Sequence, residues 1–147
     1  MKKIVGFTGG YFDIMHPGHV MMLKECHRYC DWLLVGVNKF EDKTKQADGR
    51  NKNEPIWTPH ERLYMTSACK YVDEAFLYDG EKELYTFLKN NQNNIDVRIL
   101  GADHEGHPFT GDDLDIENIF NRRDHDYSTT NTINLIIEKR GNEWKKL

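Results

Sequence analysis

The fold is decided by residues 4–19, IVGFTGGYFDIMHPGH, where a short apolar run leads through glycines to two histidines. The apolar run at 4–8 predicts a buried strand, and Gly9 and Gly10 predict the tight turn that follows it. Pro17 stands where the first residue of a helix belongs, and apolar residues recur behind it at helical spacing. The stretch therefore predicts a strand, a glycine-containing loop and the start of a helix.

The alternation of strands and helices continues along the rest of the chain. Thr58 and Glu61 have the spacing of a capping box, which predicts a helix that runs to about Lys70. Ser128 is a candidate N-cap for a last helix, which carries isoleucines at helical spacing. Further strands are predicted at 32–38, 75–78, 97–100 and, more weakly, 116–120, with a helix at 81–90. Strands that alternate with helices indicate a parallel sheet with right-handed crossovers, and hence a single, doubly wound α/β domain spanning 1–147.

The bulk properties narrow the class of function. A formal charge of -4 and a pI near 6.0 give no basic excess with which to bind nucleic acid. No apolar run approaches the roughly 18 residues of a membrane span. Three cysteines, an odd count without a CxxC pair, fit a reducing compartment. We therefore expect a cytoplasmic protein whose partners are small molecules.

The two histidines at the predicted helix start are the residues best suited to chemistry. In doubly wound sheets, ligands bind beyond the carboxyl ends of the strands, where the strand order reverses. A glycine turn followed by a helix N-terminus is suited to a phosphate, although neither GxxxxGK[ST] nor GxGxxG is present. His16 and His19, three residues apart, can both point toward one anion and stabilise charge on a leaving group. Two simpler interpretations are capping or surface histidines, and a zinc pair that needs two further ligands.

Several separated stretches of the sequence resemble a known family. They are GGYFDIMHPGH at 9–19, HER at 60–62, KYVDEAF at 70–76, GADHEG at 101–106 and RDHDYSTT at 123–130. The first resembles the motif of the HxGH nucleotidyltransferases, and the last is similar to the RTxGIST[ST] signature of their cytidylyltransferase branch. Bacterial glycerol-3-phosphate cytidylyltransferases show the nearest likeness. The resemblance covers most of the chain and implies a Rossmann-like fold.

The resemblance also implies a reaction and a set of residues. A substrate phosphate would attack the α-phosphate of CTP in line and release pyrophosphate, with Mg²⁺ accompanying the triphosphate and no covalent enzyme intermediate. The implied catalytic residues are His16, His19, Arg123, Lys43 and Lys45. The implied nucleotide-binding residues are Gly9, Gly10, Tyr11, Phe12, Asp13, Arg62, Gly101, Asp103, His104, Ser128, Thr129 and Thr130. No protein ligand to a metal is implied, and a homodimer is expected because relatives commonly form one.

The sequence also departs from the family pattern. The family often has tryptophan where His104 stands, and glycine and isoleucine where Asp126 and Tyr127 stand, so the acceptor is not taken to be glycerol phosphate. Arg62 can alternatively be interpreted as a solvated helix residue. The segment that bears Lys43 and Lys45 can alternatively be interpreted as a solvated, charged loop. Three other functions remain open: an adenylyltransferase, a catalytically silent nucleotide-binding module and a zinc-dependent hydrolase.

Overall fold

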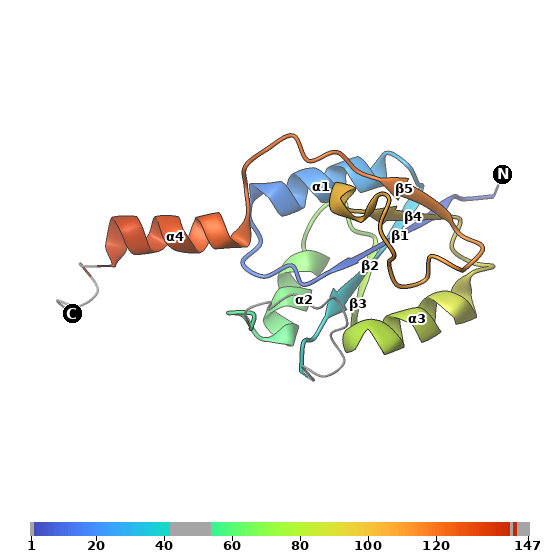
Figure 1. Cartoon of the computed structure of the whole chain (residues 1–147), viewed down its shortest axis with the longest axis horizontal. Coiled ribbons are helices and arrows are strands. Elements are labelled where there is room, and N and C mark those ends of the chain that lie inside the picture. Colours follow the sequence, from blue (N-terminus) through green and yellow to red (C-terminus); the bar gives the residue numbers. More distant parts are fainter. Residues whose placement is uncertain (1, 42–53, 142, 144–147) are drawn as a thin grey trace.

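The protein folds around a five-stranded parallel sheet with the strand order β3-β2-β1-β4-β5 (Figure 1). The computed structural model describes residues 2–41, 54–141 and 143. The strands are β1 (Val5–Gly10), β2 (Trp32–Asn38), β3 (Glu74–Tyr78), β4 (Val97–Leu100) and β5 (Glu117–Phe120). The helices are α1 (Pro17–His27), α2 (Pro59–Ser67), α3 (Gly80–Asn91) and α4 (Thr129–Arg140), with a short 3-10 helix at Ala102–His104. The predicted doubly wound α/β fold is confirmed.

The predicted boundaries differ from the observed ones mainly at helix ends. Thr58 caps α2 as predicted, because its hydroxyl oxygen accepts the amide of Glu61 at 3.3 Å. The helix ends at Ser67 and not near Lys70, and the next turn is tighter because the amide of Cys69 donates to the carbonyl of Thr66. The strand predicted at 4–8 begins one residue later and continues through both glycines.

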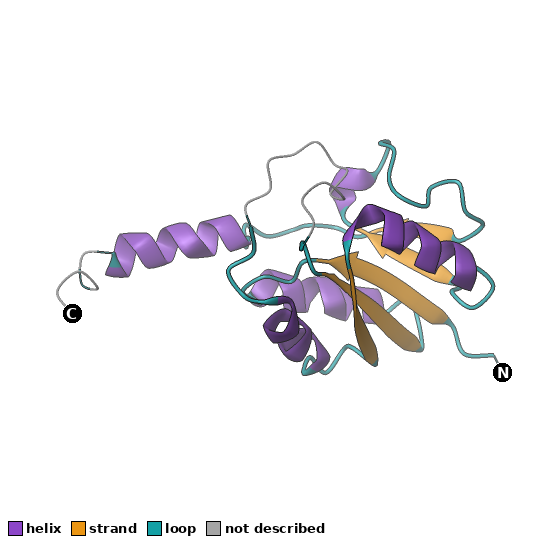
Figure 2. Ribbon diagram, turned by 90° about the horizontal axis from the view of Figure 1, so that it is seen from below, coloured by secondary structure: helices purple, strands orange, loops and turns teal. Residues whose placement is uncertain are grey.

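Helices cover both faces of the sheet and give it two apolar cores (Figure 2). On one face, Leu23 and Cys26 of α1 are fully buried with apolar residues of β2 and β4, and Leu63 of α2 packs beside them. On the other face, Leu84 and Leu88 of α3 pack against β1 and β3. The helical spacing of these residues explains why α1 and α3 lie flat on the sheet.

The strand order reverses between β1 and β4, and this reversal opens the cleft. The chain passes from β1 to β2 to β3 toward one edge, then crosses through α3 to β4 on the other side of β1. β1 pairs with β2 along its full length, but with β4 only at Gly6↔Val97 and Phe7↔Arg98. Beyond these pairs the ladder between β1 and β4 does not continue, and the carboxyl ends of the two strands border the place where doubly wound sheets bind ligands.

Helix α4 projects from the body of the domain (Figure 1). Ser128 caps it as predicted, with its hydroxyl oxygen accepting the amide of Asn131 at 3.0 Å. None of its residues is buried, and Ile136 and Ile137 are 48% and 61% exposed. The apolar residues of this helix are therefore not used by the core of their own chain. No helix in the described part of the protein is long and apolar enough to cross a bilayer.

Candidate active site

The start of α1 is capped by imidazoles. His16 is the N-cap, and its Nδ1 accepts the amide of Gly18 at 3.1 Å. The side chain of His19 reaches back, so that its Nδ1 accepts the amide of His16 at 3.2 Å. This reciprocal pair has the form of a capping box, with imidazole nitrogens in place of the usual oxygens. The two rings lie against each other with their centroids 3.8 Å apart.

This hydrogen-bond pattern assigns the tautomer of both histidines. A neutral imidazole that accepts a hydrogen bond at Nδ1 carries its own proton on Nε2. The pKa of His19 is lowered to about 3, chiefly by burial and then by the neighbouring His16 and Arg123. The pKa of His16 is lowered by burial, followed by the charges of His125 and Arg123. In the free protein His19 is therefore a neutral donor at physiological pH, with its N–H at Nε2.

The helix start differs in one respect from the sequence-based expectation. The amide of Gly18 is taken by His16, the amide of His19 donates to the carbonyl of His16 at 3.0 Å, and Pro17 has no amide proton. The first turn thus offers fewer free amides to an anion than predicted. The Nε2–H groups of His16 and His19 provide donors at this position instead.

The segment after β5 completes the cleft from the opposite side. It runs beside α1 toward the start of α4 (Figure 1), and the amide of Arg122 donates to the carboxylate of Glu25 on α1 at 3.2 Å. The guanidinium of Arg123 donates to the carbonyl of Tyr127 at 2.8 Å. Arg123 lines the same cleft as His16 and His19, and its positive charge contributes to the lowering of the pKa of both. Arg123, predicted to bind phosphate, is therefore in the same site as the histidines.

These elements enclose a cleft of roughly 1100 Å³ at the reversal of the strand order. Its lining combines the end of β1, the start of α1, the loop after β4 and the segment between β5 and α4. Nine of the predicted site residues line it: Gly9, His16, His19, Gly101, Asp103, His104, Arg123, Ser128 and Thr129. Residues far apart in the sequence are thus brought together in one cleft.

Asp13 has a structural role in the loop after β1. Its two carboxylate oxygens accept the amides of Ile56 and Trp57, at 2.8 and 3.0 Å. Its own carbonyl accepts the hydroxyl of Thr129 at 3.1 Å, which fixes the first turn of α4. Asp13 therefore joins its own loop to the segment before α2 and to the first turn of α4, and it does not line the cleft.

Arg62 is neither the predicted phosphate contact nor a solvated helix residue. Its side chain is fully buried, and burial lowers the pKa of its guanidinium. It donates four hydrogen bonds to main-chain carbonyls, those of Tyr11, Asn38, Lys39 and Trp57. Through these hydrogen bonds, the guanidinium holds together the loops after β1 and β2 and the start of α2.

The remaining predicted residues lie outside the cleft or outside the described residues. Phe12 is buried and packs against the ring of His19 at a centroid distance of 5.7 Å. Gly10, Tyr11, Phe12 and Thr130 do not line the cleft. Lys43 and Lys45 lie outside the described residues. Among the described residues, no group of three or more His, Cys, Asp or Glu side chains could hold a metal ion.

Sequence reasoning missed several residues that line the cleft. Asn121, Arg122 and His125 belong to the segment after β5, and Arg28 is at the end of α1. His125 stands within the quoted stretch RDHDYSTT, at a position that the family signature leaves open. A search for every titratable side chain within that stretch would have found it.

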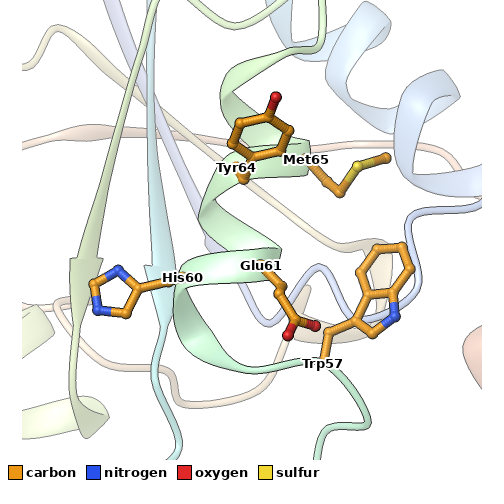
Figure 3. Close-up of a pocket in the computed structure, with 5 residues that line it drawn as sticks. All are labelled: Trp57, His60, Glu61, Tyr64 and Met65. Atoms are coloured by element: carbon orange, nitrogen blue, oxygen red, sulfur yellow. The ribbon is translucent and has the colours of Figure 1, made fainter.

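A second hollow, of about 470 Å³, lies on the outer side of α2 (Figure 3). It is lined by Trp57, His60, Glu61, Tyr64 and Met65, and we call these residues the α2 patch. Tyr64 is 77% exposed and Met65 37%. The patch is mainly apolar and shares no lining residue with the cleft.

Residues 7–134 match the model of a protein family described as cytidylyltransferase-like. The chain belongs to this family. The bifunctional protein HldE of Aliarcobacter butzleri is 35% identical over 139 residues, which are 93% of this chain and 27% of that protein. The HldE of Campylobacter jejuni subsp. jejuni serotype O:6 is 33% identical over 141 residues, or 95% and 29% of the two chains. The chain thus spans about a quarter of the length of these curated relatives.

A solved structure extends the comparison of this cytidylyltransferase-like chain to three dimensions. The lipopolysaccharide core biosynthesis protein of Thermoplasma volcanium superposes with a TM-score of 0.67 at 25% identity, covering 85% of this chain and all of that one. Pantothenate synthetase of Thermus thermophilus superposes with a TM-score of 0.56 at 13% identity, covering 87% and 60%. The second likeness concerns the fold alone. The chain is a nucleotidyltransferase-superfamily protein with that superfamily's fold.

Proposed function

We propose that the protein transfers a cytidylyl group from CTP to a phosphorylated sugar or alcohol and releases pyrophosphate. The observation that carries this proposal is the pair of adjacent imidazoles at the start of α1, each with Nδ1 occupied by a main-chain amide. Their Nε2–H groups and the guanidinium of Arg123 form a compact set of donors within a cleft at the strand reversal. A triphosphate is a ligand that needs such a set of donors.

The reaction follows from the charge that this set of residues can stabilise. An oxygen of the acceptor phosphate forms a bond to the α-phosphorus, while the bond from that phosphorus to the oxygen bridging to the β-phosphate breaks. The electron pair leaves with the pyrophosphate. His16, His19 and Arg123 are proposed to donate to phosphate oxygens as negative charge moves onto the leaving group, which is charge stabilisation without a covalent intermediate.

Mg²⁺ is proposed to enter with the nucleotide. When bound, it would neutralise part of the charge of the triphosphate. The carboxylate of Asp13, the acid next to the histidine motif, accepts two amides and does not line the cleft. The described residues thus do not form a carboxylate cage, and triphosphate oxygens are the proposed ligands of the ion.

An adenylyltransferase is the second candidate function, and the size of the cleft is compatible with it. A volume of roughly 1100 Å³ leaves room for a purine as well as for cytosine. The loop at Gly101–His104 provides the part of the lining proposed to face the base. The histidines and Arg123 would act on the phosphates in the same way with either nucleotide.

The acceptor is proposed to be a phosphorylated sugar of a surface glycan, or a related phosphorylated alcohol. One similar structure is that of a lipopolysaccharide core biosynthesis protein, which supports a sugar acceptor. His104 stands where glycerol-phosphate enzymes often have tryptophan, which argues for an acceptor other than glycerol phosphate.

The test is an assay of pyrophosphate release with Mg²⁺, in which CTP, ATP, UTP and GTP are each combined with a panel of phosphorylated sugars and alcohols. We expect release with CTP and one acceptor. Pyrophosphate release with ATP alone would support the same reaction type, with ATP and not CTP as the nucleotide substrate. Tight nucleotide binding without release in any combination would contradict the proposal and favour the silent binding module.

A homodimer is also proposed, because one chain carries two uncovered apolar surfaces. One is the α2 patch, and the other is the outer side of α4 with Ile136 and Ile137. The last turn of α4 carries Lys139 and Arg140, whereas the α2 patch contains Glu61, so the surfaces also complement each other in charge. Thr129 and Trp57 both bond to Asp13, so the start of α4 and the edge of the α2 patch are held to the same residue.

Sedimentation velocity tests the dimer. Wild type is expected at twice the mass of the chain, and Ile136→Lys with Ile137→Lys at the mass of one chain, with unchanged circular dichroism. Asn90→Lys on α3 is the control and should remain dimeric. A monomeric wild type, or a dimeric double variant, would contradict the proposed contact.

A further inference from the structure

His125 lies against the start of α1, beside the two histidines of the motif. A methyl group added at Gly18 would come within 2.7 Å of Cε1 of His125 and 2.9 Å of Cε1 of His16. The two rings therefore flank the same glycine from two segments that are more than a hundred residues apart in the sequence. Real Cβ contacts are almost never this short, so Gly18 leaves room that any other residue would fill.

The ring of His125 accepts the same kind of hydrogen bond as the other two. Its Nδ1 accepts the amide of Tyr127 at 3.1 Å, so the neutral imidazole carries its proton on Nε2. His16 and His19 also accept a main-chain amide at Nδ1. The cleft is thus lined by three histidines whose Nδ1 is occupied and whose Nε2–H remains as a donor.

We propose that His125 is a third imidazole donor to the polyphosphate of the bound nucleotide, alongside His16 and His19. This inference rests on the proposed nucleotidyl transfer and adds a binding residue that the family motifs do not contain. A triphosphate presents non-bridging oxygens along its length, so donors on two sides of Gly18 can hold successive phosphates. Arg123, two residues earlier, provides the fixed positive charge on the same segment.

A purely structural role for His125 makes a different prediction. The bond from the Tyr127 amide closes a short turn, of the kind that asparagine side chains form with their own backbone two residues on. In His125→Asn, Oδ1 can take the place of Nδ1 and keep the turn, but nothing replaces the Nε2–H. In His125→Ala, both the turn and the donor are lost. The two variants therefore separate the turn from the donor.

The experiment is calorimetric titration of wild type, His125→Asn, His125→Ala and a control, His107→Ala, with inorganic pyrophosphate, CTP and ATP. His107 is exposed and does not line the cleft. We expect both His125 variants to bind pyrophosphate and the preferred nucleotide about tenfold to a hundredfold more weakly, as for the loss of one hydrogen bond to a charged group. The control should bind like wild type, and all four proteins should show the same circular dichroism.

The outcomes separate the inference from the function on which it rests. If His125→Asn binds like wild type, the inference is wrong whatever His125→Ala does, because the donor is then dispensable. If wild type releases pyrophosphate but both variants bind it normally, the proposed function stands and the inference fails. If wild type binds neither nucleotide nor pyrophosphate, the proposed function fails and the inference with it.

Discussion

Helices α1 and α4 begin in the same way but are held in different ways. Both start at a polar N-cap next to the cleft, His16 for α1 and Ser128 for α4. Helix α1 then buries Leu23 and Cys26 completely, whereas α4 has no buried residue and projects from the domain (Figure 1). A cap and a helical pattern therefore predict that a helix exists, but only the tertiary fold shows whether its apolar side has a partner.

The largest effect is expected at the start of α1, on catalysis. His16→Ala and His19→Ala should each lower turnover by about a hundredfold to a thousandfold, because each removes a donor worth roughly 3 to 4 kcal/mol to the transition state. Steady-state kinetics of pyrophosphate release measures this, with His107→Ala as the exposed control. Unchanged turnover in both variants would show that the imidazoles only cap the helix.

The second prediction compares the apolar sides of the two helices. Leu23→Ala should lower the free energy of unfolding by about 2 to 5 kcal/mol, because it leaves a cavity in a closed core. Ile136→Ala should change it by less than about 0.5 kcal/mol in the dilute, monomeric protein. Urea unfolding at low protein concentration measures both. Equal losses of unfolding free energy in the two variants would mean that α4 is packed within its own chain.

The third prediction concerns pH and the burial of His19. The pKa of His19 falls from its ordinary 6.5 to about 3 in the folded protein, so between these values the unfolded chain binds the extra proton. Stability therefore falls as pH falls through this range, by about 2 kcal/mol between pH 7 and pH 5.

The variant His19→Asn provides the control for this pH dependence. Its Oδ1 can still accept the amide of His16, but it does not titrate. Urea unfolding of both proteins at the two pH values measures the difference, and parallel losses in wild type and variant would assign the pH dependence to other groups.

The smallest effect is expected where α4 is attached to the domain. Thr129→Val removes the hydrogen bond from the hydroxyl to the carbonyl of Asp13 and should cost about 1 kcal/mol. Thr130→Val, at the exposed next position of the same helix, is the matched control and should cost less. If the two variants unfold alike, the bond to Asp13 does not hold α4 in place.

Much of the fold and part of the site could be predicted from the sequence, because both depend on local signals. Periodicity located all five strands, and Pro17 with its flanking histidines located the start of α1. The resemblance placed Arg123 in the same site as these histidines, and the cleft contains all three.

The sequence did not predict features that depend on the environment of a side chain. Arg62, near the start of α2, could be interpreted as a phosphate contact or as a solvated residue, and only the fold shows it fully buried among four carbonyls. Likewise, His125 meets Gly18 only because the segment after β5 returns across α1. Periodicity and motif spacing describe neighbours along the chain, and these contacts are between distant segments.

The most direct test of the central claim is phosphorus NMR of a complete reaction with wild-type protein, Mg²⁺, the preferred nucleotide and its acceptor. Attack at the α-phosphate predicts loss of the three triphosphate signals, with pyrophosphate and a diphosphate-linked product appearing in equal amounts. In His16→Ala, the pyrophosphate and the diphosphate-linked product should both appear more slowly, and still in equal amounts. Release of orthophosphate in place of pyrophosphate would place the reaction at the terminal phosphate and contradict the mechanism proposed for this cleft.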